Sequence, residues 1–367
     1  MIMILTPAKI PHYLLGRGLI TYDSVVDGDL TITEKTLRNR NFKVIRRQNP
    51  SLFLKQIKNW DQQSILTLQY EATCYGLAQN DPDFAGLIPL MPKYYWFDPS
   101  QYILVIELLD NSENLADYHT RLGHFPADVA ALIGKRLGEF HREIGPKVKN
   151  GAKDSKFQKR IPWILNLHQT NPAFLDPLSA ANSQLIGILQ RYPEFPSHLN
   201  SLQNEYKFSA LIHGDIKWEN CVVYKNGGEE LQVKIVDWEL ADIGDPCWDA
   251  GAIFQSYITF WIMSIPIAGD VPPSQLLDKA KYPIDDMLPA IKAYWSAYAE
   301  ALQVEGKQQQ KDLLEKSVKC GAARMIQTVY EHMNYSPQIT PNAICLLQVC
   351  MNILENPKEA VTDLLGL

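Results

Sequence analysis

The chain has 367 residues, a length that suggests about two domains. Hydrophobic residues make up 46% and charged residues 21%, which excludes a disordered, collagen-like or coiled-coil chain. The formal net charge of −6 argues against a surface built throughout to bind nucleic acid, so we expect no nucleic-acid partner.

The cysteines and the apolar segments favour a cytoplasmic protein. Six cysteines are scattered without a CxxC pair, a pattern typical of buried thiols in a reducing compartment. No charged segment precedes a long apolar stretch at the N-terminus, so no signal peptide is predicted. The longest uncharged segment, residues 250–268, falls short of the roughly 20 apolar residues that span a bilayer. We predict a buried core helix there and no membrane partner.

Residues 28–58 alternate apolar with polar side chains, which predicts extended structure. Three runs carry the alternation, at 30–33, 42–45 and 52–57. A polar stretch at 37–41 separates the first two runs, and Asn-Pro-Ser at 49–51 separates the last two. Two linked hairpins of an antiparallel sheet fit this pattern.

A change of period follows these strands. Residues 64–80 have apolar side chains at helical spacing, and Asn-Asp-Pro at 80–82 predicts the end of that helix. Residues 94–97 and 102–109 are again strand-like, the second as a nearly continuous apolar run typical of a central strand. The polar break at 110–114 predicts a domain boundary, with domains at 1–110 and 111–367.

The second predicted domain is mainly helical. After Pro126, apolar residues from Val129 to Ile144 recur at spacings of three and four, and residues 251–367 also look helical. Two short apolar runs, 210–213 and 221–224, flank a polar loop. Asn226-Gly227 precedes a further strand-like run that begins at residue 232, and this pair predicts a hairpin turn.

The densest chemical signal lies in three short segments. Residues 213–220 are His-Gly-Asp-Ile-Lys-Trp-Glu-Asn, residues 235–238 are Ile-Val-Asp-Trp, and residues 244–249 are Gly-Asp-Pro-Cys-Trp-Asp. In this order and spacing they resemble the H-G-D-x-x-x-x-N, I-x-D-W/F-E and G-D-P-x-x-D segments of the aminoglycoside phosphotransferase and choline kinase group. The matched segment covers only about 40 residues.

The resemblance implies an α+β, bilobal protein-kinase-like fold. Its N-terminal lobe, residues 1–110, would bind nucleotide with a five-stranded antiparallel sheet and one helix. Its larger, mainly helical C-terminal lobe, residues 111–367, would carry catalysis and acceptor binding. The order of strands and then helices along the chain agrees with this layout.

The same resemblance assigns roles in phosphoryl transfer, which needs positioned charge and an aligned nucleophile rather than covalent help. Asp215 would be the catalytic base, while Asn220 and Asp237 would be ligands of Mg²⁺, which prefers oxygen. Asp249 would tie the catalytic loop down by hydrogen bonds. For Asp245 and Asp249 we favour structural roles, since an isolated Asp in a loop is usually a turn former or helix cap.

A phosphotransferase also needs a cation on the nucleotide phosphates. Lys55, in the third strand-like run, stands where kinase-like proteins keep that lysine, and Glu71 on the following helix would pair with it. Each also has a plainer interpretation as a surface residue of its strand or helix. The cofactors implied are ATP, or alternatively GTP, with Mg²⁺.

The region around Lys55 is strongly basic. Between residues 35 and 58 there are eight basic residues and no acidic one, which favours a polyphosphate ligand over the alternative of a solvated basic face. They are Lys35, Arg38, Arg40, Lys43, Arg46, Arg47, Lys55 and Lys58. Arg38 and Arg40 fall in the loop where the resemblance places the phosphate-covering turn, and this loop has no GxGxxG. The backbone from Glu107 to Leu109 would contact the base.

Two departures from protein kinases bear on the acceptor. Gly214 stands where protein kinases carry Arg, and only thirteen residues run from Asp237 to Asp249, without an A-P-E segment. Both favour the hydroxyl of a small molecule, such as an amino alcohol, aminoglycoside, sugar or homoserine-like metabolite. Against this, Lys217 occupies the place of the phosphate-holding lysine of Ser/Thr kinases, which keeps a short peptide open as acceptor, for example a natural-product precursor acting with a lyase.

A third alternative is a catalytically silent binding module, although the chain retains the base, the metal ligands and the lysine. The acceptor pocket is expected in residues 147–206 and in the helices after Gly251. Five aromatic or imidazole side chains there are candidates for the pocket, or alternatively for the core: Trp163, His168, Trp248, Tyr257 and Trp261.

Overall fold

The computed structural model describes residues 3–35, 38–149, 157–171, 179–225, 228, 230–266 and 277–367. The chain divides into two compact units, the first formed by Met1–Leu115 and Glu219–Ala241 and the second by Ala116–Trp218 and Asp242–Leu367. The first unit thus extends beyond the predicted boundary at residue 110 and takes in a later segment. The reason is strand pairing, because β6 (Glu113–Asn114) pairs with β8 (Cys221–Lys225), and β8 pairs with β9 (Leu231–Ile235).

A five-stranded antiparallel sheet organises the first unit, as the sequence predicts. The strand order is β1-β2-β3-β5-β4. The strands are β1 (Leu30–Glu34), β2 (Asn39–Arg46), β3 (Leu52–Ile57), β4 (Tyr94–Asp98) and β5 (Ile103–Glu107). Strand β2 begins earlier than expected, so residues 39–41 are strand rather than loop, and Asn41 pairs with Lys55 of β3.

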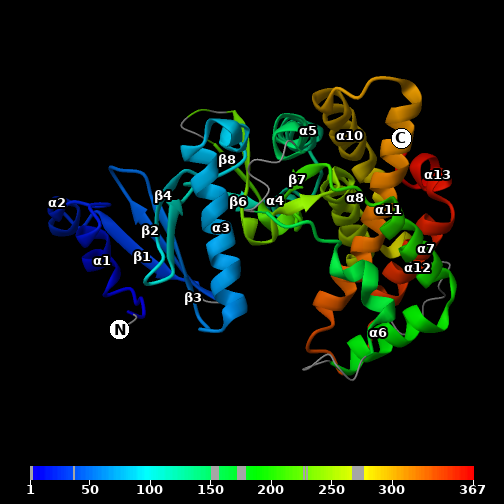
Figure 1. Cartoon of the computed structure of the whole chain (residues 1–367), viewed down its shortest axis with the longest axis horizontal. Helices are drawn as coiled ribbons and strands as arrows, with labels where there is room; N and C mark the ends of the chain where they lie inside the picture. Colours follow the sequence, from blue (N-terminus) through cyan, green and yellow to red (C-terminus); the bar gives the residue numbers. More distant parts are fainter. Residues whose placement is uncertain are drawn as a thin grey trace. The chain divides into compact units, whose positions relative to one another are not determined.

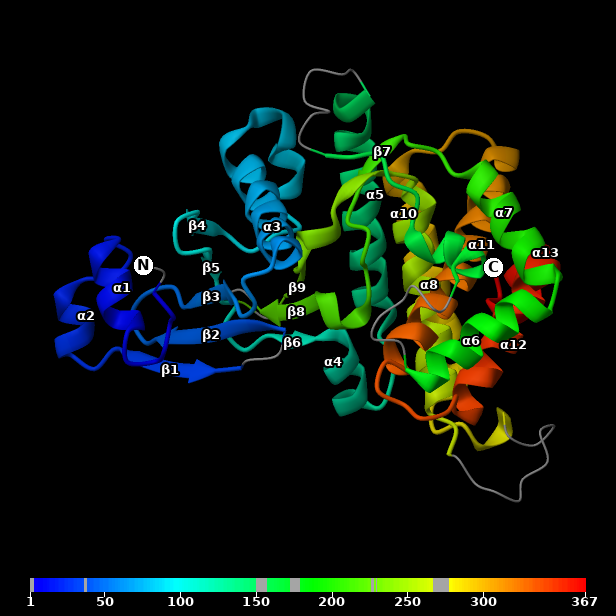
Figure 2. The ribbon, with the colours of Figure 1, turned by 60° about the horizontal axis from the view of Figure 1, so that its bottom comes forward.

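Helices accompany the sheet. The predicted helix is α3 (Gln62–Asn80), which packs against β3 and β4, and Asp61 caps it by accepting from Ser64 N at 2.9 Å (Figure 1). A 3₁₀ turn, η1 (Pro82–Leu87), follows it. Two further short helices, α1 (Ile10–Gly16) and α2 (Tyr22–Val26), precede the sheet where the sequence indicated no element, and both views show them beside it (Figure 2).

One face of the sheet is apolar and packs against this N-terminal segment. Phe42, Val44 and Leu54 are fully buried there against Ile10 and Leu14. Because successive side chains of a strand point to opposite faces, the intervening residues of β2 lie on the other face. The N-terminal segment therefore leaves that other face, which carries Asn39, Asn41 and Lys43, available for a ligand.

The second unit is mainly helical. Helix α5 (Ala127–Lys149), predicted from its apolar period, packs along α10 (Leu288–Leu302) (Figures 1 and 2). The close approach depends on Gly134, where a Cβ atom would meet the backbone of Tyr294. The described residues of the second unit also form the helices α4 (Leu115–Leu122), α6 (Ala180–Arg191), α7 (Glu194–Glu205), α8 (Pro246–Met263), α11 (Lys307–His332), α12 (Pro341–Glu355) and α13 (Pro357–Glu359), with helical turns η3 (Trp163–Gln169), η7 (Leu277–Lys279), η8 (Ile284–Met287) and η9 (Ala360–Leu364). The turn η5 (Trp218–Asn220) lies where the chain passes from the second unit to the first.

Strands β7 (Ala210–Ile212) and β10 (Asp242–Gly244) form a small antiparallel pair. Strand β7 ends directly before the first motif segment, and β10 leads into the third. Residues 226–227 of the predicted hairpin turn lie outside the described residues, as do parts of the region 147–206 in which the acceptor pocket is expected. All six cysteines are free thiols. Among the described residues no helix has the length and apolarity needed to cross a membrane.

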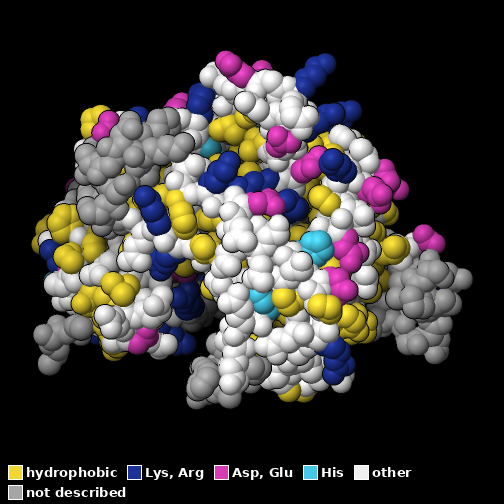
Figure 3. All heavy atoms as spheres, turned by 45° about the vertical axis from the view of Figure 1, so that its right-hand side comes forward, with side chains coloured by type: hydrophobic (Ala, Val, Ile, Leu, Met, Phe, Trp, Pro, Cys, Tyr) yellow, Lys and Arg dark blue, Asp and Glu magenta, His cyan; other side chains and the backbone are white. Residues whose placement is uncertain are grey.

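The charged side chains of the surface are mixed in sign. On the face drawn in Figure 3, Lys and Arg side chains lie among Asp and Glu side chains. Ion pairs within the second unit such as Lys319 with Glu205, at 2.5 Å, illustrate the same balance. This mixture agrees with the modest net charge of the chain.

Candidate active site

A cavity of about 550 Å³ lies in the first unit, in the size range of small-molecule sites. Strands β2, β3 and β5 contribute to it, together with segments that follow β5 and flank β8 and β9. Its wall includes Lys35, Arg38, Asn39, Asn41, Lys43, Phe53, Lys55, Glu71, Ile106, Glu107, Leu108, Leu109, Ser112, Asn114, Glu219, Asn220, Asp237 and Glu239. Most of these side chains are polar or charged, which suits a charged ligand.

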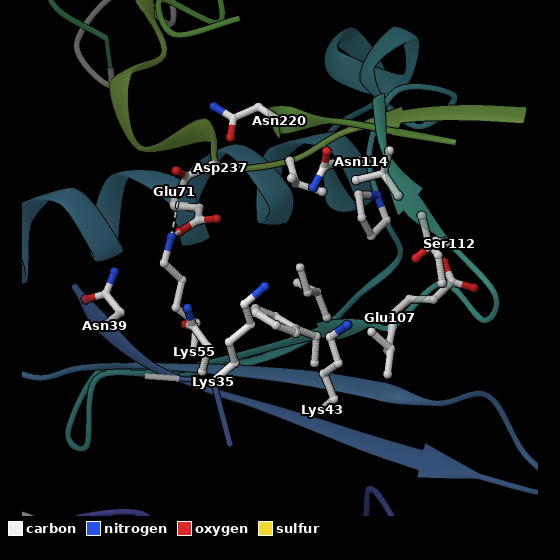
Figure 4. Close-up of a pocket in the computed structure, with 18 of the residues that line it drawn as sticks. Lys35, Asn39, Lys43, Lys55, Glu71, Glu107, Ser112, Asn114, Asn220 and Asp237 are labelled. Atoms are coloured by element: carbon white, nitrogen blue, oxygen red, sulfur yellow. Dashed lines mark hydrogen bonds and ion pairs between the residues drawn. The ribbon is translucent and has the colours of Figure 1, made fainter. Parts of the chain in front are cut away.

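Lys55 is the central cation of this cavity. Its Nζ lies 2.6 Å from Glu71 Oε2 and 2.6 Å from Asp237 Oδ1, and Figure 4 shows the three side chains converging. Burial acts to lower the pKa of Lys55, but the two carboxylates outweigh it and raise that pKa above its usual value. Burial raises the pKa of the Glu71 carboxyl, against the opposing effect of Lys55. The predicted ion pair of Lys55 with Glu71 is therefore present, and Asp237 completes it.

Asp237 owes its position to an uncommon backbone conformation. Its φ of 68° and ψ of 55° lie in the left-handed region, where Asp and Asn are several-fold enriched among non-glycine residues. The next residue, Trp238, is fully buried and donates from Nε1 to the Ile235 carbonyl at 2.8 Å. The buried indole thus anchors the turn, and the left-handed residue directs its carboxylate to Lys55.

The alternation of side chains along β2 decides which of its residues line the cavity. Asn39, Asn41 and Lys43 line it, whereas Arg40 lies between them in β2 and is not part of the lining. Because alternate residues point to opposite faces, Arg40 shares the face of Phe42. Arg40 is therefore not part of the lining of this cavity, and its role in cofactor binding stays a prediction. That prediction rested on a loop where the structure has a strand.

Arg38 precedes that strand and does line the cavity. Its Nη1 lies 2.5 Å from Glu239 Oε1, and the Arg38 side chain is 59% exposed while that of Glu239 is 9% exposed. Lys35 and Lys43 also extend into the cavity (Figure 4). Both lysines belong to the basic stretch of residues 35–58, which by itself assigned neither of them to a site. Lys43 lies between the apolar residues Phe42 and Val44, and this alternation was the signal that could have placed it on the cavity face.

The predicted base-contacting segment borders the same cavity. Glu107, Leu108 and Leu109 all line it. The Glu107 carboxylate accepts from Lys93 N at 3.0 Å, and Leu108 N donates to the Ser51 carbonyl at 2.9 Å. These bonds hold the segment at the end of β5, where its backbone borders the ligand space.

The donor set of the cavity fits a hard divalent cation. Asn220 and Asp237 both line it, and their amide and carboxylate oxygens are ligands that Mg²⁺ prefers. The described residues contain no cluster of three His, Cys, Asp or Glu side chains that could hold a metal by themselves. Mg²⁺ would therefore need oxygens from its ligand or from water, as is usual for this ion at phosphate sites.

The loop that carries Asp215 belongs to the second unit, and buried hydrogen bonds hold its backbone. Asp249, fully buried at the start of α8, accepts from His213 N at 2.6 Å and from Gly214 N at 3.0 Å. Gly214 has a φ of 80°, a conformation that L side chains rarely adopt. The prediction that Asp249 ties down this loop is confirmed.

His141 of α5 supports Asp249 and was missed by the sequence analysis. Its Nε2 lies 3.4 Å from Asp249 Oδ2, and its Nδ1 lies 3.0 Å from the Tyr298 hydroxyl. Burial acts to raise the pKa of Asp249, but the hydrogen bonds with His141 and the loop lower it below its usual value. A chain of three buried side chains therefore connects α10 to the motif loop.

The carboxylate of Asp215 has a cation beside each oxygen. Lys217 Nζ lies 2.9 Å from Oδ2, and Arg324 Nη2 of α11 lies 3.5 Å from Oδ1. Lys217 also lies 3.8 Å from Glu331 Oε2. The motif predicted Lys217, but Arg324 is 109 residues from Asp215 in the chain and belongs to no motif that we identified.

The remaining candidates are mostly structural. Asp245 caps α8 by accepting from Cys247 N at 3.1 Å and also accepts from Lys207 N, which confirms its structural role. Of the five candidate pocket side chains, four are buried in the second unit, namely His168, Trp248, Tyr257 and Trp261. Trp163 is 46% exposed, and its ring centroid lies 5.0 Å from that of Tyr330.

Comparison of the sequence with known proteins identifies the family of the chain. The sequence profile of the phosphotransferase enzyme family matches residues 38–270, well over half of the chain. The chain belongs to this family. The match contains β2, Lys55, the loop that carries Asp215, and Asp249, and it ends before Arg324. No curated protein sequence matches the chain.

Solved structures of several kinases and phosphotransferases have the same fold. An ethanolamine kinase of Plasmodium vivax is 13% identical, with 95% of this chain and 89% of that chain covered and a TM-score of 0.57. A choline kinase of Cryptosporidium parvum is 13% identical, with 98% and 99% covered and a TM-score of 0.56. An aminoglycoside 2′-phosphotransferase IIIa variant in complex with GDP is 13% identical, with 96% and 97% covered and a TM-score of 0.54. The predicted kinase-like fold and phosphotransferase family are therefore confirmed.

Proposed function

We propose that this phosphotransferase moves the γ-phosphoryl group of ATP, with Mg²⁺, to a hydroxyl group of a small molecule. The observation that carries the proposal is Lys55, which bridges Glu71 and Asp237 in the cavity. The family and the neighbouring kinases support phosphoryl transfer to a small alcohol. The size of the cavity and the cations that line it, Lys35, Arg38, Lys43 and Lys55, support a nucleotide.

The residues of the first unit bind and orient the nucleotide in this proposal. Lys55 contacts the α- and β-phosphates, Arg38 and Lys43 add positive charge, and the backbone of Glu107 to Leu109 contacts the base. Asn220 and Asp237 hold Mg²⁺, which when bound neutralises the charge that develops on the phosphate oxygens. Since one neighbouring structure holds GDP, GTP is tested beside ATP.

The residues of the second unit prepare the acceptor. Asp215 accepts the proton of the acceptor hydroxyl while its oxygen attacks the γ-phosphorus. The bond between the γ-phosphorus and the bridging oxygen breaks, and ADP leaves with the bonding electrons. Lys217, 2.9 Å from Asp215, supplies a positive charge beside the transferred group. The Asp249 hydrogen bonds hold the loop so that little reorganisation is needed during transfer.

Lys217 also favours a second acceptor, the Ser or Thr hydroxyl of a short peptide. Lys217 stands where Ser/Thr kinases have their phosphate-holding lysine, and it forms an ion pair with Asp215. A lysine in this position is expected of a peptide kinase. The short stretch between Asp237 and Asp249 offers little platform for a peptide, so the small molecule remains our first proposal. A silent binding module is the third candidate.

Acceptor-resolved phosphotransfer tests the proposal. The purified chain is incubated with Mg²⁺ and γ-labelled ATP or GTP, against a library of small alcohols and a set of short Ser- and Thr-containing peptides. Asp215→Asn is expected to lower transfer by about 100-fold or more, because a positioned general base contributes roughly 10² to 10⁴ in rate. Asp285→Asn, an exposed carboxylate of the second unit, is the matched control and should retain full activity.

Each outcome selects one candidate. Label in a small alcohol supports our first proposal, and label in a peptide selects the second. Tight binding of Mg-ATP with no transfer to any acceptor or to water selects the silent module. Full activity in Asp215→Asn would contradict the catalytic role of this residue.

A further inference from the structure

The catalytic loop lacks an arginine in its own motif, and α11 supplies one from elsewhere in the chain. Arg324 Nη1 donates to the Gly214 carbonyl at 3.0 Å, and Nη2 donates to the Ile216 carbonyl at 2.8 Å. These two carbonyls belong to the residues directly before and after Asp215. The same Nη2 lies 3.5 Å from the Asp215 carboxylate. One guanidinium therefore contacts three consecutive residues of the loop.

The Arg324 side chain is buried, so its contacts must replace the water that a cation would otherwise bind. The Arg324 side chain is only 4% exposed, and removing a cation from water costs several kcal/mol unless good partners replace the water. Every hydrogen-bond acceptor that Arg324 has among the described residues belongs to the loop. Its Nε has no acceptor there, while the ring of Trp248 lies 5.3 Å from Cζ and supplies a cation–π contact.

Close helix packing puts Arg324 in this position. Gly251 of α8 and Gly321 of α11 lie against each other, so a Cβ atom at either would meet the backbone of the other helix. Arg324 follows Gly321 by three residues, and Trp248 precedes Gly251 by three, which places each pair on one helix face. Trp248 Nε1 also donates to the Gly214 carbonyl at 3.2 Å. Two side chains from different helices thus share one carbonyl of the loop.

We propose that Arg324 is a positioning residue for phosphoryl transfer, and that it fixes the direction of the Asp215 carboxylate. This inference rests on the proposed function. The two carbonyl contacts hold the backbone on both sides of Asp215, while Arg324 and Lys217 each hold one carboxylate oxygen. A planar fork with two donors fixes direction in a way that a single ammonium group does not. Misplacement of a reacting group by about 1 Å can cost about 100-fold in rate.

The test compares Arg324→Met and Arg324→Lys in the full chain. The readouts are kcat and KM for formation of ADP from Mg-ATP with water or any acceptor found above, the Kd of Mg-ATP, and the melting temperature. Arg142→Met is the matched control, because Arg142 donates to the Ala301 carbonyl at 2.6 Å, and it has no contact with the loop among the described residues. Asp215→Asn is run in parallel.

We expect kcat to fall about 100-fold in Arg324→Met and about tenfold in Arg324→Lys, with the Kd and KM of Mg-ATP within twofold of the wild type. A third variant, Arg324→Ala, leaves space for a free guanidinium ion. Millimolar guanidinium should restore part of kcat to this variant, and equal concentrations of sodium chloride should not. The inference is overturned if kcat stays within twofold in Arg324→Met, or if kcat falls only as far as it does in an equally destabilised Arg142→Met. If turnover does not depend on Asp215, the proposed function fails with it. If turnover depends on Asp215 but not on Arg324, only the positioning role fails.

Discussion

The cavity of the first unit and the loop around Asp215 in the second unit hold their candidate functional groups in different ways. In the cavity, charged side chains hold one another, as Lys55 does with Glu71 and Asp237. In the loop, side chains from distant helices hold the backbone itself, as Asp249 and Arg324 do. A nucleotide can enter the first arrangement by exchanging partners for phosphates. Under the proposed function the second arrangement must keep its partners, because a base has to be aligned before the acceptor arrives.

This difference predicts where a substitution will act. A change in the cavity should weaken ligand binding and leave the loop backbone in place. A change beneath the loop should lower kcat and loosen the backbone with little effect on nucleotide binding. Amide hydrogen exchange read by mass spectrometry distinguishes the two, since peptides that cover residues 209–216 report on the loop alone.

The largest effect is expected from Asp249→Asn. The variant leaves His141 without its charged partner and offers one acceptor oxygen to two backbone donors, so we expect the free energy of unfolding of the second unit to fall by about 3 kcal/mol. Peptides covering residues 209–216 should exchange faster, while those covering Leu52–Ile57 should not change. Asp285→Asn serves as the control in urea unfolding. Unchanged protection of the loop would contradict the anchoring role of Asp249.

A smaller effect, on ligand binding and not on the loop, is expected from Lys55→Met. The substitution removes the central cation of the cavity and leaves Glu71 buried without its partner, so Mg-ATP affinity should fall by about 10- to 100-fold. Titration calorimetry measures this loss, and hydrogen exchange at residues 209–216 should match the wild type. Lys58→Met, an exposed lysine just after β3, is the control and should bind normally. A loosened loop in Lys55→Met would contradict the separation of the two regions.

The smallest effect concerns the pH dependence of the second unit. Burial lowers the pKa of His119 from 6.5 to about 3, and the His119 ring lies 4.4 Å from the Trp218 ring, centroid to centroid. The unfolded chain therefore binds a proton below pH 6.5 that the folded chain does not bind until about pH 3. The free energy of unfolding should therefore fall by about 1.4 kcal/mol for each pH unit between pH 6.5 and about pH 3.

His119→Phe should remove this slope, because a phenyl ring can stay packed among the same aromatic neighbours without binding a proton. Urea unfolding at several pH values between 5 and 7.5 measures the slope. His332→Phe, at an exposed position, should retain it. An equal slope in wild type and His119→Phe would show that another group controls the acid stability.

Short-range patterns were sufficient for much of the fold and for the motif residues. Strand alternation predicted β1, β2 and β3, and the helical period predicted α3 and α5, because periods of two and 3.6 express directly which side of an element is buried. Residues 213–220 and 235–238 identified Asp215, Asn220 and Asp237, since a loop of fixed length must present these groups at fixed spacing. The family match agrees with these motifs.

Tertiary structure alone decided the rest. Arg40 looked equivalent to Arg38 until strand β2, which begins at Asn39, turned it to the opposite face of the sheet. Arg324 and His141 lie far from the loop in sequence, and no local period or motif connects them to Asp215. They reach the loop because whole helices pack together, at Gly251 and Gly321 for instance, and helix packing depends on surfaces brought together from the entire chain.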